Sequence, residues 1–379
     1  MRVKTENSAA KTENSSAPAS PGWVRLRRAA LARLGRKPPA RRERRLNLAL
    51  QGGGAHGAFT WGVLDRLLDE AELEINALAG ASAGAVNAVL LAAGLAEGGR
   101  EGAKAKLESF WDTLAHMPGA VLASKAGDVG GDLAAAMSPT TLLALSARML
   151  SPYQTNPLGL NPLRELLANL VDFERLRRSP LRLHIAATEV ATGTGRLFST
   201  AEISLDVVLA SACLPHYHHA VEVDGRHYWD GGYSANPPLL ALALDRRVGD
   251  TLLVQLMPLS REHLPTQADE IAEHVNNIVF VAPLRREIEQ IASARRRWDR
   301  RLLPLGAAAR LARHRFHRID AAEGLREARA GSRLIAERRT LARLRDQGRA
   351  AADGWLARHG GAIGRNATID LVAEALGTN

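Results

Sequence analysis

The stretch from residue 46 to residue 84 most constrains what this chain can fold into. It holds, in order, an apolar run, a glycine cluster, a helix-like segment, a second apolar run and a serine between glycines, at residues 46–50, 52–54, 58–70, 75–79 and 80–84. Short apolar runs that end in turn residues are typical of buried strands, and a helix between two such strands favours parallel pairing. The stretch therefore predicts an α/β fold.

The following part of the chain adds strands to this beginning. Further strands are predicted at residues 181–187, 195–199 and 251–256, with a hairpin over residues 220–229. Strands that alternate with helices predict a mostly parallel sheet with helices on both faces. The expected architecture is a three-layer α/β/α domain.

The chain changes character beyond these strands. Residues 268–301 and 322–358 are rich in Arg and Ala, with apolar residues near helical spacing, and Pro283 and Pro304 should interrupt the helices. We therefore divide the chain into a disordered basic leader, an α/β body and a mainly helical C-terminal extension, at residues 1–45, 46–258 and 259–379.

The formal net charge of +10 is unevenly distributed. Residues 1–45 carry 13 basic and 3 acidic residues, residues 46–284 carry 16 and 26, and residues 285–318 carry 11 and 3. An acidic body with basic arms suits nonspecific attraction to an anionic surface. We expect peripheral contact with an anionic membrane and no specific nucleic-acid partner. The alternative is that the arms are only solvated, flexible charge.

The cysteine content and the apolar stretches bear on the compartment. Cys213 is the only cysteine, so no internal disulfide can form, which favours a reducing compartment. Residues 1–20 are polar and lack the apolar core of a signal peptide. Residues 75–96 are uncharged, but their pattern changes from strand-like to helix-like at Gly80, so a buried strand and helix explain them better than a membrane span. We expect a cytoplasmic protein without a transmembrane helix.

The segment Gly80-Ala81-Ser82-Ala83-Gly84 is a candidate nucleophile site. It matches G-x-S-x-G between a predicted strand and a predicted helix, which is the context of a nucleophile elbow. The flanking glycines let strand and helix approach closely, and the serine oxygen then projects near the positive end of the following helix. The alternative is a tight packing turn in a chain rich in Ala and Gly.

The glycine cluster has two chemical interpretations. Gly52, Gly54 and Gly57 match the G-x-G-x-x-G pattern of dinucleotide sites, but such a site also needs an acid at the end of the second strand, where this chain has the Ser82 turn. Unpaired N–H groups at the start of a helix equally stabilise the oxyanion of an acyl-transfer reaction. Because Ser82 is close in sequence, we prefer the oxyanion hole and keep the dinucleotide site as an alternative.

A serine nucleophile needs a base. Three histidines cluster in residues 214–219, without an acid or cysteine in metal-ligand spacing, and a surface loop explains them equally well. Asp230-Gly231-Gly232 offers a carboxylate at a predicted strand end with room beside it, although such a triplet alone is more often a plain turn. We expect no metal and no cofactor.

In this order, the glycine cluster, the Ser82 turn and Asp230-Gly231-Gly232 resemble the patatin-like phospholipase family over residues 46–258. The resemblance implies hydrolysis of lipid acyl esters through a Ser–Asp dyad and an acyl-enzyme. Ser82 would be the nucleophile and Asp230 the base.

The resemblance also implies roles for the glycines. The oxyanion hole would be formed by Gly52, Gly53 and Gly54, and five further glycines belong to the motifs: Gly57, Gly80, Gly84, Gly231 and Gly232. The family commonly has Arg or Lys where this chain has His56, so a fixed cation is replaced by a group that can be neutral at pH 7.

Two rival functions stay open at this point. The first is an α/β-hydrolase esterase with a Ser–Asp–His triad, in which His263 or His274 would serve. The second is a noncatalytic scaffold whose basic arms contact membranes or nucleic acid. The sequence leaves the lipid class and the oligomeric state open.

Overall fold

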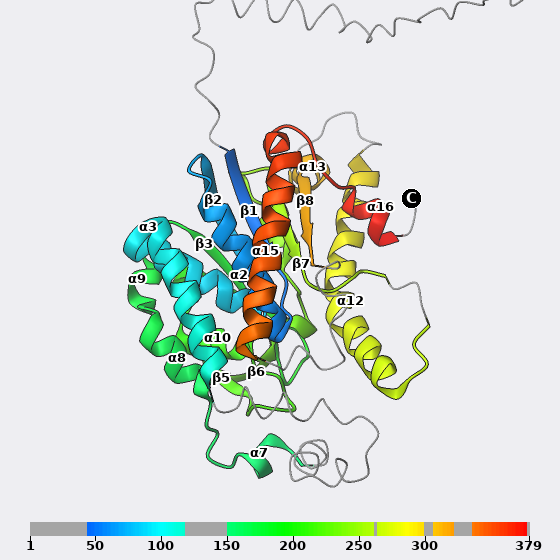
Figure 1. The fold of residues 1–379 in the computed structure, drawn as a ribbon. Coiled ribbons are helices and arrows are strands. Elements are labelled where there is room, and N and C mark those ends of the chain that lie inside the picture. Colours follow the sequence, from blue (N-terminus) through cyan, green and yellow to red (C-terminus); the bar gives the residue numbers. More distant parts are fainter. Residues whose placement is uncertain (1–43, 118–149, 261–263, 299–305, 322–335, 377–379) are drawn as a thin grey trace, which may run out of the picture. The chain divides into compact units, whose positions relative to one another are not determined.

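The structure is a computed structural model that describes residues 44–117, 150–260, 264–298, 306–321 and 336–376. Within these residues eight strands form one sheet (Figure 1). The strands are β1 (Arg44–Leu50), β2 (Leu73–Gly80), β3 (Arg182–Glu189), β4 (Gly195–Ser199), β5 (Val221–Val223), β6 (Arg226–Asp230), β7 (Asp250–Gln255) and β8 (Arg315–Asp320). The order is β5-β6-β3-β2-β1-β7-β8, and β4 also pairs with β3.

The sheet is mostly parallel, as predicted. β3, β2, β1, β7 and β8 pair in parallel. β4, β5 and β6 form antiparallel pairs at one side. The carboxyl ends of β1, β2 and β7 therefore point the same way, and their following turns meet at one end of the sheet.

Helices connect and cover the strands. The α-helices are α2 (Gly57–Leu68), α3 (Ala83–His116), α7 (Pro152–Thr155), α8 (Pro162–Leu170), α9 (Phe173–Arg177), α10 (Leu205–Ser211), α11 (Leu239–Ala243), α12 (Ala268–Trp298), α13 (Ala307–Arg313), α15 (Arg338–His359) and α16 (Leu371–Leu376). Short 3-10 turns are η1 (Gly54–His56), η2 (Thr200–Glu202), η3 (Gly231–Tyr233) and η5 (Gly360–Ala362).

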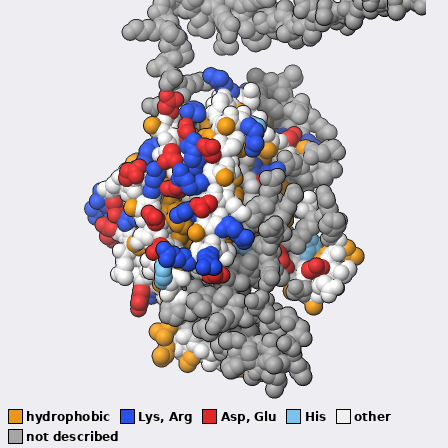
Figure 2. Space-filling view, viewed as in Figure 1, with side chains coloured by type: hydrophobic (Ala, Val, Ile, Leu, Met, Phe, Trp, Pro, Cys, Tyr) orange, Lys and Arg blue, Asp and Glu red, His pale blue; other side chains and the backbone are white. Residues whose placement is uncertain are grey.

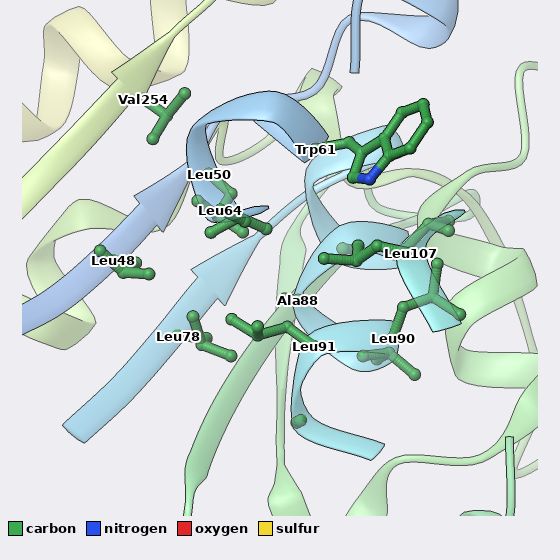
Figure 3. Packing of buried hydrophobic residues seen from close by; sticks show 14 of the residues in the cluster. Leu48, Leu50, Trp61, Leu64, Leu78, Ala88, Leu90, Leu91, Leu107 and Val254 are labelled. Atoms are coloured by element: carbon green, nitrogen blue, oxygen red, sulfur yellow. The ribbon is translucent and has the colours of Figure 1, made fainter. Parts of the chain in front are cut away.

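The two faces of β1 show how the three layers form. Leu48 and Leu50 are fully buried in a cluster with Leu64 of α2, and this packing is visible in Figure 3. Ala49 points to the opposite face, where it joins a second cluster with Leu284 of α12. Alternate residues of a strand face opposite sides, and each fully buried leucine contributes roughly 1.5–3 kcal/mol. The predicted α/β/α architecture is confirmed.

The long uncharged stretch at residues 75–96 is divided between β2 and α3, as predicted. α3 consists of two helical pieces that meet at Gly98 and Gly99, whose backbone angles are not helical. None of the helices in the described part of the chain combines the length and the apolar character that a membrane crossing needs.

The C-terminal extension is mainly helical, with one strand that the sequence pattern did not indicate. β8 pairs in parallel with β7, and α15 packs on α2. The prediction that Pro283 interrupts its helix is wrong, because α12 continues through it. The buried residues Leu284 and Ile288 anchor the following turns against the sheet, which offsets the lost backbone hydrogen bond.

The described residues from Arg44 onward belong to one compact unit. The predicted division at residue 258 therefore stays a prediction about independent folding. Pro304 and the predicted disordered leader, apart from its last two residues, lie outside the described residues.

Candidate active site

Ser82 lies on a sharp turn between β2 and α3. Its backbone angles, φ 55° and ψ −132°, are ones that a residue with a side chain rarely adopts, at a cost of roughly 1–3 kcal/mol. The flanking glycines are required by close approach: a Cβ on Gly80 would lie 2.6 Å from Gly84 backbone atoms, and a Cβ on Gly84 would lie 2.1 Å from the Leu50 oxygen. The predicted strand–turn–helix context of this serine is confirmed.

The end of α10 holds the Ser82 turn in place. The Ser82 N–H donates to the backbone oxygen of Ser211 at 3.0 Å and lies 3.1 Å from its hydroxyl oxygen. Ser211 is fully buried. Sequence reasoning did not single out this residue, because a serine at the end of an apolar helix carries no motif of its own.

Asp230, the last residue of β6, is fully buried. Its Oδ1 accepts the Gly232 N–H at 2.7 Å, and its own N–H donates to the Cys213 oxygen at 2.8 Å. Its Oδ2 is buried and accepts no hydrogen bond from any described residue. This second oxygen is therefore available to accept a proton.

Burial raises the pKa of the Asp230 carboxyl group to about 7. The Gly232 amide and the Ser82 hydroxyl oppose this shift in part, because both favour the charged form. The Ser82 hydroxyl thus lies close enough to the Asp230 carboxyl group to favour its charged form, and nucleophile–base contacts are commonly imperfectly aligned before substrate binds. The structure thus brings the two predicted catalytic residues together from positions 148 apart in the chain.

The glycine turn, residues 52–54, lies against Ser82, but its three backbone amides differ in their hydrogen bonding. A Cβ on Gly52 would lie 2.7 Å from Ser82 Cβ. The Gly52 N–H is already occupied, since it donates to Asn236 Oδ1 at 2.7 Å. The amides of Gly53 and Gly54 have no acceptor among the described residues. Gly54 has φ +58°, which favours glycine. Two of the three predicted donors are thus open, at the start of η1 and α2.

Two buried amide side chains fix the glycine turn. Asn236 accepts from Gly52 and donates from Nδ2 to the Phe280 oxygen at 3.1 Å. Gln51 Oε1 accepts the N–H groups of Leu256 and Met257 at 2.7 and 2.8 Å. Both residues were missed by sequence reasoning. A signal was present for Gln51, a polar residue at the end of a mostly apolar run.

The other predicted glycines occupy places where a side chain would collide. A Cβ on Gly57 would lie 2.8 Å from Ala83 Cβ, which shows how closely the starts of α2 and α3 approach. A Cβ on Gly231 would lie 2.0 Å from the Ala186 oxygen. Each glycine therefore has a packing role next to the candidate site.

None of the histidines that the structure describes joins the candidate dyad. In the described part of the chain no histidine hydrogen-bonds to Ser82 or Asp230, and no three His, Cys, Asp or Glu residues are grouped closely enough to hold a metal ion. His219 stacks on Tyr153, with ring centroids 4.0 Å apart. His56 is buried in η1, and His263 lies outside the described residues.

Residues 48–243 match the family model described as patatin-like phospholipase. Among solved structures, the chain is similar to VipD from Legionella pneumophila, with 14% identity, a TM-score of 0.39, and coverage of 84% of this chain and 68% of that chain. It is also similar to the type III effector protein ExoU, with 15% identity, a TM-score of 0.33, and coverage of 83% and 53%. No curated protein matches the chain.

Proposed function

Since this chain belongs to the patatin-like phospholipase family, we propose that it is a serine lipid acyl hydrolase whose catalytic dyad is Ser82 and Asp230. One observation carries this proposal. Ser82, on its strained turn, lies beside a fully buried carboxylate that has a free oxygen and a pKa near neutral. Perturbed, buried carboxyl groups next to a nucleophile are typical of catalytic sites.

The first half of the reaction acylates the serine. Asp230 Oδ2 accepts the hydroxyl proton while Ser82 Oγ attacks the ester carbonyl carbon, and the carbonyl oxygen becomes an oxyanion. When the intermediate collapses, the ester C–O bond breaks and the leaving alcohol takes the proton from Asp230. The products of this half are the alcohol and an acyl-enzyme.

The second half releases the acid. Asp230 accepts a proton from water, and the hydroxide oxygen attacks the acyl carbonyl. Collapse of this intermediate breaks the bond to Ser82 Oγ, which recovers the proton, and the fatty acid leaves. A carboxylate with a pKa near the working pH is suited to both roles, because it can accept and return a proton with little free-energy cost.

The open amides of Gly53 and Gly54 are the proposed oxyanion donors. They lie at the start of η1 and α2, next to the Ser82 turn, where backbone N–H groups favour negative charge. Loss of one such donor typically lowers kcat about 10²–10³-fold. Gly52, whose amide is held by Asn236, has a supporting role instead.

Labelling with a fluorophosphonate probe separates this proposal from its rivals. We expect the probe to modify Ser82 in the wild type, as identified by peptide mass spectrometry, and to leave the folded Ser82→Ala variant unlabelled. Asp230→Asn should slow labelling strongly, whereas Asp224→Asn in the same hairpin should not.

Three results would favour the rivals. An unlabelled but folded wild type would favour the scaffold. Slow labelling in a His274 or His263 variant would favour the triad. Thermal stabilisation by NAD would favour the dinucleotide site.

The proposed substrates are carboxylic esters of lipids, and a panel of phospholipid, glyceride and thioester substrates distinguishes these classes.

We further propose that the basic arms attract the protein to anionic membranes. Co-sedimentation with anionic vesicles should then fall as salt is added, because screening weakens charge attraction. Equal binding to neutral vesicles at every salt concentration would contradict this electrostatic contact.

A further inference from the structure

The first half of α12 is apolar on two opposite sides. One side packs into the protein, where Phe280, Val281 and Leu284 are buried. The opposite side is exposed: Ile271, Val275, Ile278 and Val279 keep 44%, 54%, 54% and 40% of their surface in solvent. Their spacing places them on one stripe of the helix. We call these four residues the α12 stripe.

A stripe of this kind differs from scattered exposed residues. Single exposed apolar side chains are ordinary, whereas contiguous ones mark an interaction surface. Leu264, just before the helix, is also 85% exposed. Figure 1 shows the first turns of α12 reaching beyond the sheet, and Figure 2 shows hydrophobic side chains at the corresponding lower right margin.

The helix that carries the α12 stripe is bonded to the candidate active site. The Phe280 backbone oxygen accepts a hydrogen bond from Asn236 Nδ2, and Asn236 Oδ1 accepts the Gly52 N–H. The Phe280 ring lies 4.8 Å from the Tyr233 ring, and a Cβ on Gly232 would lie 2.5 Å from the Phe280 ring. The inner side of α12 thus contacts the Asp230 turn while the outer side presents the stripe.

A second group of exposed apolar residues lies in α7 and just after it. Tyr153, Leu158 and Leu160 are 55%, 82% and 67% exposed. Tyr153 stacks on His219, and its hydroxyl oxygen accepts the Ala220 N–H at 3.1 Å. Figure 1 shows α7 and the beginning of α12 both toward the lower part of the fold.

We propose that the α12 stripe inserts into the interfacial layer of a phospholipid bilayer and holds the active site at the lipid surface. The inference rests on the proposed function, because a bilayer is the surface that contains the proposed lipid ester substrate. The contact is apolar rather than electrostatic: residues 264–284 contain three acidic residues and no Lys or Arg. It is therefore distinct from the contact proposed for the basic arms.

Vesicles of pure phosphatidylcholine in 0.5 M salt test the stripe, because neutral lipid and salt suppress the basic arms. Val275→Gln with Ile278→Gln should weaken co-sedimentation about tenfold or more. Leu197→Gln, on β4 with 41% exposure, is the matched control and should bind like the wild type. Hydrolysis of vesicle lipid should fall with binding, and by a larger factor than hydrolysis of a water-soluble short-chain ester.

A second measurement does not depend on the folding of the double variant. Cys213 is buried and is the only cysteine, so Val275→Cys can be labelled selectively with an environment-sensitive fluorophore. Its emission should shift to the blue on adding the same vesicles, whereas a label at Leu197→Cys should not respond.

Two results would overturn the inference: unchanged vesicle binding in a folded double variant, or no spectral shift at position 275. Dissociation of a wild-type dimer in the double variant, with vesicle binding intact, would instead assign the stripe to a second copy of this chain. Failure of the proposed function has a different signature, in which the wild type binds vesicles through the stripe but hydrolyses neither vesicle lipid nor soluble ester.

Discussion

At the scale of single residues, the proposed chemistry depends on a carboxyl group that the fold keeps out of water. Asp230 is fully buried, with one oxygen held by the Gly232 amide and the other open. An exposed carboxylate of ordinary pKa would activate a serine only weakly, since such a carboxylate is a weak base for the hydroxyl proton. In the proposed dyad, burial of Asp230 would supply the basicity that a histidine supplies in a triad.

The pH dependence follows from this burial. Asp230 acts as a base only when ionised, and its pKa is raised to about 7, so kcat/KM on a soluble ester should rise with pH through about 7 and level off above it. Stopped-flow or plate-reader initial rates between pH 5 and 9 measure this profile. A rate that is already level above pH 5 would show that no group with a raised pKa limits the reaction.

Asn236 gives a second test at this scale. Asn236→Ala removes the acceptor of the Gly52 N–H, so the glycine turn is no longer fixed against Ser82. Misplacement of oxyanion donors by about 1 Å typically costs about 10²-fold, and we expect a loss of this size in kcat with a smaller change in KM. Ser211→Ala is the comparison, with a loss below about tenfold, because the Ser211 backbone oxygen still accepts from Ser82. Equal effects of the two variants would contradict the proposed role of Asn236.

The candidate site was predictable where a motif is local and not where it depends on distant contacts. Ser82 and its glycines are recognisable because the strand, turn and helix are contiguous. Gly52 was predicted as a donor, yet its amide is taken by a side chain 184 positions away. No local pattern near residue 52 contains that information.

At the scale of elements, the packing of α15 on α2 is the feature that sequence periodicity did not reveal. Each helix contributes a glycine to the contact: a Cβ on Gly62 would lie 1.9 Å from the Arg345 oxygen, and a Cβ on Gly348 would lie 2.0 Å from the Phe59 oxygen. Ion pairs flank it, with Arg66 2.9 Å from Asp353 and Arg349 beside Asp65. The close approach fixes α2 against α15, and α2 directly follows η1, where the proposed oxyanion donors lie.

Gly348→Ala tests this contact. The added methyl group collides with backbone, which cannot rotate away, so the free energy of unfolding should fall by about 1–3 kcal/mol in urea titrations. Gly354→Ala in the same helix is the control, because its nearest neighbour would be a flexible arginine at 3.7 Å, and it should be neutral or stabilising by up to about 1 kcal/mol. A neutral Gly348→Ala variant would contradict the close packing of these helices.

β8 was missed for a physical reason. Its six residues, Arg-Phe-His-Arg-Ile-Asp, include only two apolar ones, which does not resemble a strand buried in a sheet. The side chains of Arg315 and His317 are accommodated by Asp250 of β7, at 2.9 Å from Arg315 Nε and 3.1 Å from His317 Nε2. Burial alone would raise the pKa of Asp250, but these hydrogen bonds outweigh it and lower the pKa. Asp250, whose carboxylate compensates the charge of Arg315, lies 65 positions away in the chain, so no pattern near β8 reveals it.

At the scale of the whole molecule, the family match ends at residue 243, but the sheet and its covering layers do not. β8 extends the sheet, and α12 covers the face opposite to α2 and α3. The fold class could be predicted because alternating strands and helices determine it locally. The part that the C-terminal extension plays in the fold could not be predicted, because it depends on pairing with strands formed much earlier in the chain.

Truncation tests the predicted domain division. A chain that ends at residue 258 loses β8, α12 and α15, which leaves an apolar sheet face uncovered, and we expect it to aggregate without a cooperative unfolding transition. A chain that lacks residues 1–43 keeps the compact unit and should melt like the full chain. Cooperative unfolding of the chain that ends at residue 258, measured by calorimetry, would establish residues 46–258 as an independent domain.

Release of fatty acid from phospholipid–detergent micelles tests the Ser82–Asp230 dyad most directly. The wild type should release fatty acid, whereas Ser82→Ala and Asp230→Asn should each lower the rate at least about 10³-fold while remaining folded, and Asp224→Asn should match the wild type. Substantial release by a folded Ser82→Ala or Asp230→Asn variant would contradict the dyad.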